Sequence, residues 1–376
     1  MRNKIINVGH HKLEGYSVMR KNLLLAVSGL ALSGILACSH VSRVGTDNSS
    51  ELALVKNFSC YNCIIGEIGW AALNDPANSR ILYACLKGAT RQELATLGLA
   101  DLSDHLRQLE EGTLLKRVDG FYKLGYPAIS GSEREELRIL MSQVASKLFP
   151  AARDMVQQIR PHLRGREKML YHIVWSGLMD GYYAWDTLGK QLAKELGNAQ
   201  VDQRTGWWIW PPHPYSSGTS TYGGLIITSL AGYPNPDHLR KEIEPVLDGL
   251  ITSAVNNQPI PEHEGLLRLK NFGFIDDRGH SRLLVVKTES AIVPVAIQLS
   301  TAFARNAMLH LDIVNLTQML ETTPEKALVI AYHELCWELL KLLSSHGDLR
   351  IPDVKVSGGN DAYRLVSCYV NGLEYE

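Results

Sequence analysis

Hydrophobic positions recur along most of the chain at the spacing of amphipathic helices, and short strand patterns interrupt them. The clearest succession of elements lies in residues 75–127. Asp75 followed by Pro76 predicts the start of a first helix, because Asp caps free backbone amides and Pro fits the first helical turn. Thr90 and Glu93 have the spacing of a capping box and predict a second, short helix.

A third helix and a β-hairpin complete this succession. Leu102, Leu106 and Leu109 recur at helical spacing, so they predict the buried face of a helix that Asp101 opens. The dipeptide at positions 119–120, Asp-Gly, lies between two apolar-rich segments and is a strong signal for a two-residue hairpin turn. We therefore expect three helices followed by a hairpin.

Residues 131–376 are expected to form a mainly helical domain, so the predicted fold class is mainly α with small β-hairpins, an α+β protein. Helices are predicted at 132–160, 165–196, 236–256, 298–320 and 323–347, and a last strand at 362–370. The first of these is expected to end at Pro150 or shortly after, because Pro lacks an amide donor. Cys85 and Cys336 lie within helical patterns and are expected to be buried thiols.

The stretch from 206 to 224 is rich in aromatic residues, proline and glycine. Its three prolines argue against a helix or a central strand, so we expect a loop. Tryptophans are costly to expose, which leaves two interpretations: a loop packed on the body, or an adhesive binding edge. The candidate binding residues on the second interpretation are Trp207, Trp208, Trp210 and His213.

Charge is unevenly distributed along the chain, although the net charge is only −1. Residues 1–37 hold five Lys and Arg and one acid, which leaves 33 basic and 38 acidic residues, a net of −5, in the remainder. A body of that sign offers no electrostatic reason to bind nucleic acid.

The N-terminus has the pattern of a secretory signal. Arg20 and Lys21 precede an apolar run at residues 23–37, which is short for a membrane span, and Cys38 follows it. Since residues 1–18 have no place in such a signal, translation from Met19 is an alternative start.

The sequence Ile35-Leu36-Ala37-Cys38 resembles the lipobox of bacterial lipoproteins. The resemblance implies cleavage before Cys38, acylation of that cysteine, and anchoring on the extracytoplasmic side of a cell membrane. Residues 1–37 would then be the signal peptide, and residues 38–68 a lipidated tether and linker. The alternative is that the apolar run is a buried helix of a cytoplasmic protein.

The three helices and the hairpin resemble a winged helix-turn-helix of the small bacterial repressor families, which assigns a winged-helix-like module to residues 69–130. The resemblance implies that the third helix would enter the major groove of DNA. Residues 101–111, however, hold four acids against Arg107 alone, and residues 75–127 hold seven basic and seven acidic residues. Because DNA affinity depends on neutralising phosphates, we expect a protein partner rather than nucleic acid. A weaker helix-then-hairpin pattern at 266–287 is similar to a second, degenerate winged-helix unit.

A search for catalytic chemistry gives little. His333 and Glu334 begin a pattern like that of zinc proteases, but position 337 is Trp where the second His would stand, so no metal site is expected. Glu334, Glu338 and Lys341 share one helix face and are interpreted as a solvated, paired surface. There is no Gly-x-Ser-x-Gly elbow, and no cofactor motif or catalytic set is assigned.

Three functions are therefore carried forward. The first is a membrane-anchored binding or scaffold lipoprotein, which contacts a protein through the winged-helix-like module or the aromatic loop. The second is a winged-helix DNA-binding regulator, which rests on residues 75–127. The third is an exported hydrolase with a site near His213.

Overall fold

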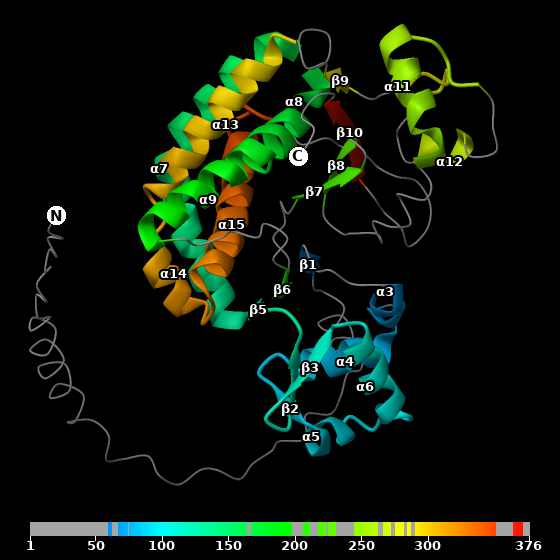
Figure 1. The fold of residues 1–376 in the computed structure, drawn as a ribbon, viewed down its shortest axis with the longest axis vertical. Helices are drawn as coiled ribbons and strands as arrows, with labels where there is room; N and C mark the ends of the chain where they lie inside the picture. Colours follow the sequence, from blue (N-terminus) through cyan, green and yellow to red (C-terminus); the bar gives the residue numbers. More distant parts are fainter. Residues whose placement is uncertain are drawn as a thin grey trace, which may run out of the picture. The chain divides into compact units, whose positions relative to one another are not determined.

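Residues 49–376 form one compact unit in the computed structural model (Figure 1). The structure describes residues 59–61, 67–73, 75–163, 167–197, 206–210, 217–222, 225–230, 244–261, 266–271, 275–281, 284–286, 290–350 and 364–370. The predictions for the signal segment, Cys38 and His213 lie outside these residues. As expected, the fold is mainly helical with small sheets.

The region predicted to hold three helices and a hairpin contains all of them. Its elements are α3 (Glu67–Leu73), α4 (Pro76–Ala84), β2 (Ala89–Thr90), α5 (Arg91–Ala95), α6 (Leu102–Glu111), β3 (Leu115–Val118) and β4 (Phe121–Leu124). The three strands form a sheet in the order β2-β4-β3. Thirteen buried residues make its core, among them Leu106 and Leu109 of α6 and, from far along the chain, Trp208.

Local capping and turn chemistry explain where these elements begin and end. Asp75 accepts a hydrogen bond from the amide of Ala77 at 2.8 Å, and Thr90 and Glu93 form both bonds of the capping box. Asp119 and Gly120 have φ values of 52° and 82°, the left-handed conformation that a tight hairpin turn requires. The predictions for these signals are confirmed.

The second hydrophobic core lies among long helices. They are α7 (Gly131–Ile159), α9 (Tyr182–Leu196), α13 (Ile292–Met308), α14 (Ile313–Met319) and α15 (Pro324–Ser345). Two further helices, α11 (Leu247–Asn256) and α12 (Leu266–Asn271), contribute none of the residues of this core. α15 packs on α7 and α14, and α13 packs on α7 and α9 (Figure 1). Every side chain of α15 from Ala327 to Leu340 is buried, which makes this the central helix of the core.

The helix predicted at 132–160 is confirmed as α7, but its predicted end at Pro150 is wrong. The unbroken helices predicted at 165–196 and 298–320 are also wrong, and α13 and α14 divide the second of these ranges. α7 continues through Pro150 to Ile159, where buried Ala152, Met155 and Val156 hold its last turns against the core. The helix predicted at 165–196 is broken into short helical segments before α9: Arg160–Leu163, Glu167–Met169, α8 (Leu170–His172) and a π-helix, η3 (Ile173–Met179). Cys85 and Cys336 are buried, as predicted.

The aromatic stretch contains a central strand where a loop was predicted. β6 (Trp207–Trp210) lies between β1 (Ser59–Tyr61), which is antiparallel to it, and β5 (Ala128–Ser130), which is parallel. None of the three prolines falls within these four residues, so nothing interrupts the pairing. The strand is buried on both faces, which is why its sequence lacks polar alternation.

A four-stranded sheet completes the described part of the chain. Its order is β7 (Ser217–Tyr222), β8 (Leu225–Leu230), β10 (Arg364–Val370) and β9 (Leu284–Val286). The last predicted strand is thus confirmed. β9 runs parallel to β10, and an isolated antiparallel bridge joins Ile275 to Ser281 at the expected hairpin. The second winged-helix unit stays a prediction.

In the part of the chain that the structure describes, no single helix combines the length and hydropathy needed to cross a membrane. α13 and α14 meet those criteria only as a pair, by length and composition alone, and they are bent by 68° at the break between them.

Candidate functional site

The central helix α15 carries three ionisable side chains at buried positions. His333 is 6% exposed, Glu334 is fully buried and Glu338 is 1% exposed. Charged groups leave water only at a cost, so their presence in a core helix calls for partners or for a function. The three define the candidate site, together with the residues of α7 and η3 that face them.

Glu334 faces Arg134 of α7, which is itself 5% exposed. The guanidinium Nη2 lies 3.6 Å from Oε1 of Glu334, within ion-pair distance but beyond a hydrogen bond. Both carboxylate oxygens of Glu334, and Nε and Nη1 of Arg134, have no hydrogen-bond partner among the described residues. The pair is therefore close but incompletely satisfied, in contrast to most buried polar groups.

This environment shifts the ionisation of Glu334. Burial raises its pKa from 4.5 to about 7, and the carboxylate of Glu338 adds to the rise. Arg134, His333 and Arg138 oppose the rise, and Arg134 is the strongest of these three. Burial outweighs the nearby cations, so Glu334 can gain or lose a proton near neutral pH.

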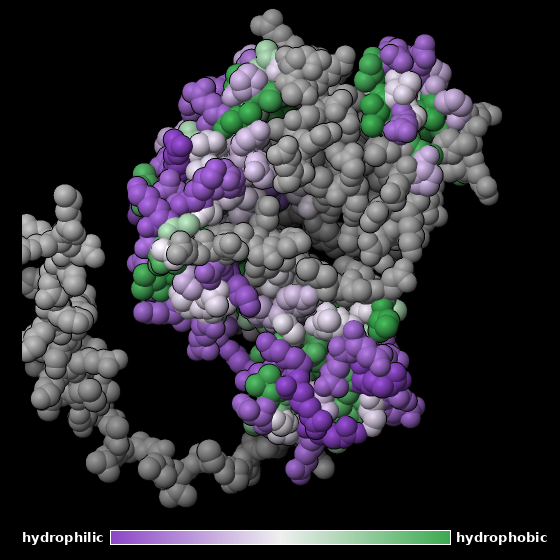
Figure 2. Space-filling view, in the orientation of Figure 1, coloured by the Kyte–Doolittle hydropathy of each residue, from purple (hydrophilic) through white to green (hydrophobic). Residues whose placement is uncertain are grey.

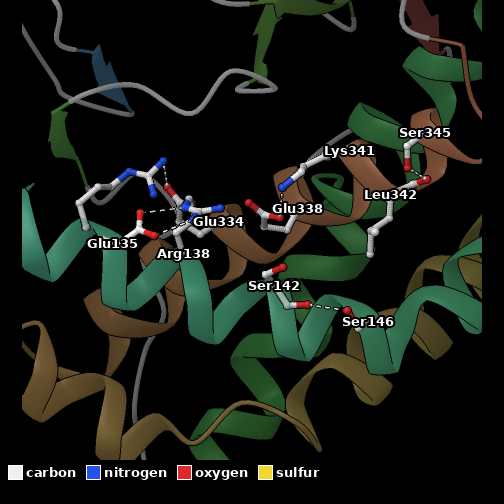
Figure 3. Close-up of polar contacts among 10 residues, drawn as sticks. Glu135, Arg138, Ser142, Ser146, Glu334, Glu338, Lys341, Leu342 and Ser345 are labelled. Carbon is white, nitrogen blue, oxygen red and sulfur yellow. Dashed lines mark hydrogen bonds and ion pairs between the residues drawn. The ribbon is translucent and has the colours of Figure 1, made fainter.

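The two buried glutamates continue into exposed and half-exposed charges at the edge of the site, which are Glu135, Arg138 and Lys341. Figure 3 shows Glu334, Glu338 and Lys341 following one another along α15, with Glu135 and Arg138 of α7 beside Glu334. Arg138 donates two hydrogen bonds to Glu135, at 2.9 and 2.6 Å, and Lys341 donates one to Glu338 at 3.1 Å. These bonds pair cations with anions along the contact between α7 and α15.

His333 is held by acceptors on both ring nitrogens. Nδ1 lies 2.7 Å from the carbonyl oxygen of Val329, and Nε2 lies 3.4 Å from Oδ1 of Asp180. Asp180 also accepts a hydrogen bond from the indole of Trp185 at 2.9 Å. A carbonyl oxygen and a carboxylate oxygen can only accept hydrogen bonds. An imidazole with a proton on Nδ1 can therefore donate to Val329, and an imidazole with protons on both nitrogens can donate to both partners.

Aromatic rings enclose His333. The Trp207 ring centroid lies 4.8 Å from that of His333, and the rings of Trp185, Trp337 and Trp175 lie 5.2, 5.9 and 6.4 Å away. The tryptophan cluster excludes water from the polar groups beneath it, which strengthens their mutual electrostatics.

The sequence-predicted binding residues separate in the structure. Trp207 lies against the site, whereas Trp208 lies in the core of residues 72–124, and both are fully buried, so neither ring forms an exposed binding edge. The alternative interpretation, inward packing, holds for these two. The side chain of Trp210 and all of His213 lie outside the described residues.

The interpretation of Glu334 and Glu338 as a solvated surface is wrong, because both are buried. The pairing of Glu338 with Lys341 is confirmed. Sequence reasoning also missed Arg134 and Asp180. The i, i+4 spacing of Arg134 and Arg138 matched that of the two glutamates, but this spacing is equally common on solvated helices.

Among the described residues, no group of His, Cys, Asp and Glu side chains is arranged to hold a metal ion. The site can bind and release a proton at Glu334 and can hold α7 against α15 through charge. Comparisons with protein-family models, with curated proteins and with solved structures gave no match.

Proposed function

We propose that this chain is a lipid-anchored binding protein on the extracytoplasmic side of a membrane, held there by acyl chains on Cys38. The support for the anchor is the lipobox-like sequence Ile35-Leu36-Ala37-Cys38 behind a basic and apolar leader. Two or three acyl chains would hold a protein stably at a bilayer, where one would not.

We further propose that residues 69–130 are a winged-helix-like module that contacts a protein. The order α4-β2-α5-α6-β3-β4 and the sheet order β2-β4-β3 support a winged-helix assignment. One observation favours a protein over DNA: Arg107, the one Lys or Arg of α6, is bound by Asp104 at 3.3 Å and by Glu111 at 3.2 Å. Phosphates would have to displace both carboxylates, and α6 has no second cation to offer.

Mass spectrometry of the mature protein tests the anchor. We expect an N-terminal peptide that begins at Cys38 and carries the mass of its acyl chains, and a Cys38→Ser variant that lacks this mass and leaves the membrane fraction. An intact peptide spanning Leu36 and Ser39 would contradict the proposal and favour the cytoplasmic regulator.

A mobility-shift assay at physiological salt tests the choice between DNA and protein. We expect no shift by the parent and none by the double variant Asp104→Ala, Glu111→Ala, because releasing Arg107 supplies a single cation on α6. A salt-dependent shift by the parent protein would instead support the DNA-binding alternative. The hydrolase alternative rests on His213 and gains no support from the described residues.

A further inference from the structure

The strand register of the hairpin divides its residues between two faces. Leu115 pairs with Leu124, and both side chains are buried against α6 and its neighbours. On the opposite face, one residue further along each strand, Lys116 pairs with Lys123 and Val118 pairs with Phe121. We call this outer set, Lys116, Val118, Phe121 and Lys123, the wing face.

The wing face combines a large exposed ring with two cations. Phe121 is 42% exposed, and Lys116 and Lys123 are both exposed. Figure 2 shows such hydrophobic patches among hydrophilic surface over the helices and strands of this module. A like-charge pair directly across two strands is unfavourable by itself, so the fold keeps a repulsion here that an anionic partner would relieve.

The two lysines differ from the other cations of the module. Carboxylates bind two of these other cations, Lys87 (to Glu133, at 2.6 Å) and Arg107. The remaining three have other partners: Arg80 donates to the carbonyl of Leu97, Arg91 donates to the hydroxyl of Ser103, and Arg117 lies over the ring of Tyr122. Within the described parts of the chain, neither Lys116 nor Lys123 has a carboxylate within ion-pair distance. The wing face is thus a local cationic surface on a body whose net charge is −5.

We infer that the wing face docks on the anionic phospholipid headgroups of the membrane that carries the lipid anchor, an inference that rests on the proposed function. Lysines around an apolar ring suit the interface, where the ring enters the acyl boundary and the cations meet phosphates. About 20 residues separate Cys38 from Ser59, and such a chain reaches at most about 70 Å, so the module stays near the bilayer.

Magnitudes explain why this small surface suffices. Each lysine near an anionic bilayer contributes about a fivefold preference, or about 30-fold for the pair. That is weak for a free protein, but the acyl anchor turns docking into an intramolecular step at an effective concentration on the order of millimolar. An acidic protein partner would bind the wing face from solution, so it would lack the advantage that the acyl anchor gives to the membrane.

The test uses the mature, lipidated protein in vesicles, with Phe121→Trp as a reporter of insertion. Vesicles contain phosphatidylglycerol and phosphatidylcholine, with or without brominated acyl chains that quench a nearby indole. We expect bromine to quench the added fluorescence of Phe121→Trp, and pure phosphatidylcholine or high salt to abolish this quenching. Of the seven native tryptophans, Trp175, Trp185, Trp207, Trp208 and Trp337 are buried. The parent protein in the same vesicles gives the background of the native set, which is subtracted.

Charge reversal provides the decisive comparison. In the reporter protein, Lys116→Glu with Lys123→Glu should lower the ratio of docked to undocked protein at least 30-fold, because two attractions become repulsions. The matched control is Lys147→Glu with Lys194→Glu, two exposed lysines on α7 and α9, which changes the net charge equally and should leave quenching intact.

The outcomes separate the two proposals. Protein that fails to enter vesicles because Cys38 carries no acyl chain contradicts the proposed function. Protein that enters anionic vesicles but shows the same fluorescence with and without bromine contradicts docking alone. Equal loss of quenching in the control pair would also overturn the inference, since it would reduce the effect to net charge.

Discussion

Glu334 combines full burial with a carboxyl group that titrates near neutrality, and this makes it a test of how the core holds charge. Its pKa is about 7 in the folded protein and 4.5 in the reference state, so the folded state binds more protons between these values. The contribution of Glu334 to folding stability should therefore be greatest below pH 4.5 and should decline as the pH rises to about 7. The full difference is about 3 kcal/mol.

Urea denaturation of the parent and of Glu334→Gln at several pH values measures this effect. We expect the parent to lose about 3 kcal/mol relative to Glu334→Gln between pH 4.5 and pH 8, because the amide cannot titrate. Glu135→Gln is the matched control: that exposed carboxyl has its pKa lowered by the hydrogen bonds of Arg138, so this variant should keep the decline of the parent between pH 4.5 and pH 8. A difference that stays constant with pH would show that Glu334 does not titrate in this range.

The hairpin between β3 and β4 depends on backbone conformation alone at its tip. Gly120 has a φ of 82°, and a Cβ placed on it would meet no atom within 4 Å. Gly120→Ala should thus destabilise the protein by about 1 kcal/mol through backbone strain. Gly249, within α11, has equally open space but helical backbone, so Gly249→Ala should stabilise by about 0.5–1 kcal/mol. Thermal unfolding checks both variants: the melting temperature should fall for Gly120→Ala and rise for Gly249→Ala. A change of melting temperature in the same direction for both would refute the prediction.

Signals that act within a few residues predicted the elements well. The caps at Asp75, Thr90 and Thr323 each mark the start of an observed helix, because the side chain bonds a backbone amide two or three residues on. Predictions failed where distant segments decide. β6 exists because segments at 59–61 and 128–130 pair with it, and no local pattern in the sequence specifies those partners.

The candidate site was missed for the same reason. Glu334 and Glu338 have the spacing of a solvated, ion-paired helix surface, and only the approach of α7 buries them. Arg134 lies 200 positions earlier in the sequence, and Asp180 follows a π-helix that the periodicity did not predict. Charge patterns fix which residues share a helix face, but tertiary packing fixes whether that face meets water.

β6 joins the two hydrophobic cores through the alternation of a single strand. Trp207 and Ile209 belong to the core of the long helices, whereas Trp208 belongs to the core of the helices and hairpin that precede them. Since successive side chains of a strand point to opposite faces, one short segment is anchored in both cores. We therefore expect a substitution on one face of β6 to loosen the core on that face, so that the two cores open as separate units.

Hydrogen exchange of two neighbouring variants tests this division between the cores. Trp208→Ala removes a buried ring from the smaller core, at a cost of about 3–5 kcal/mol, and should speed exchange chiefly in α4, α6 and β4. Trp207→Ala should instead speed exchange in α7 and α15, since its ring packs beside His333 and Trp337. If both variants opened the same peptides, the two faces of β6 would not serve separate cores. A separation of the two sets of peptides, from substitutions one residue apart, would show that each face of the strand stabilises its own core.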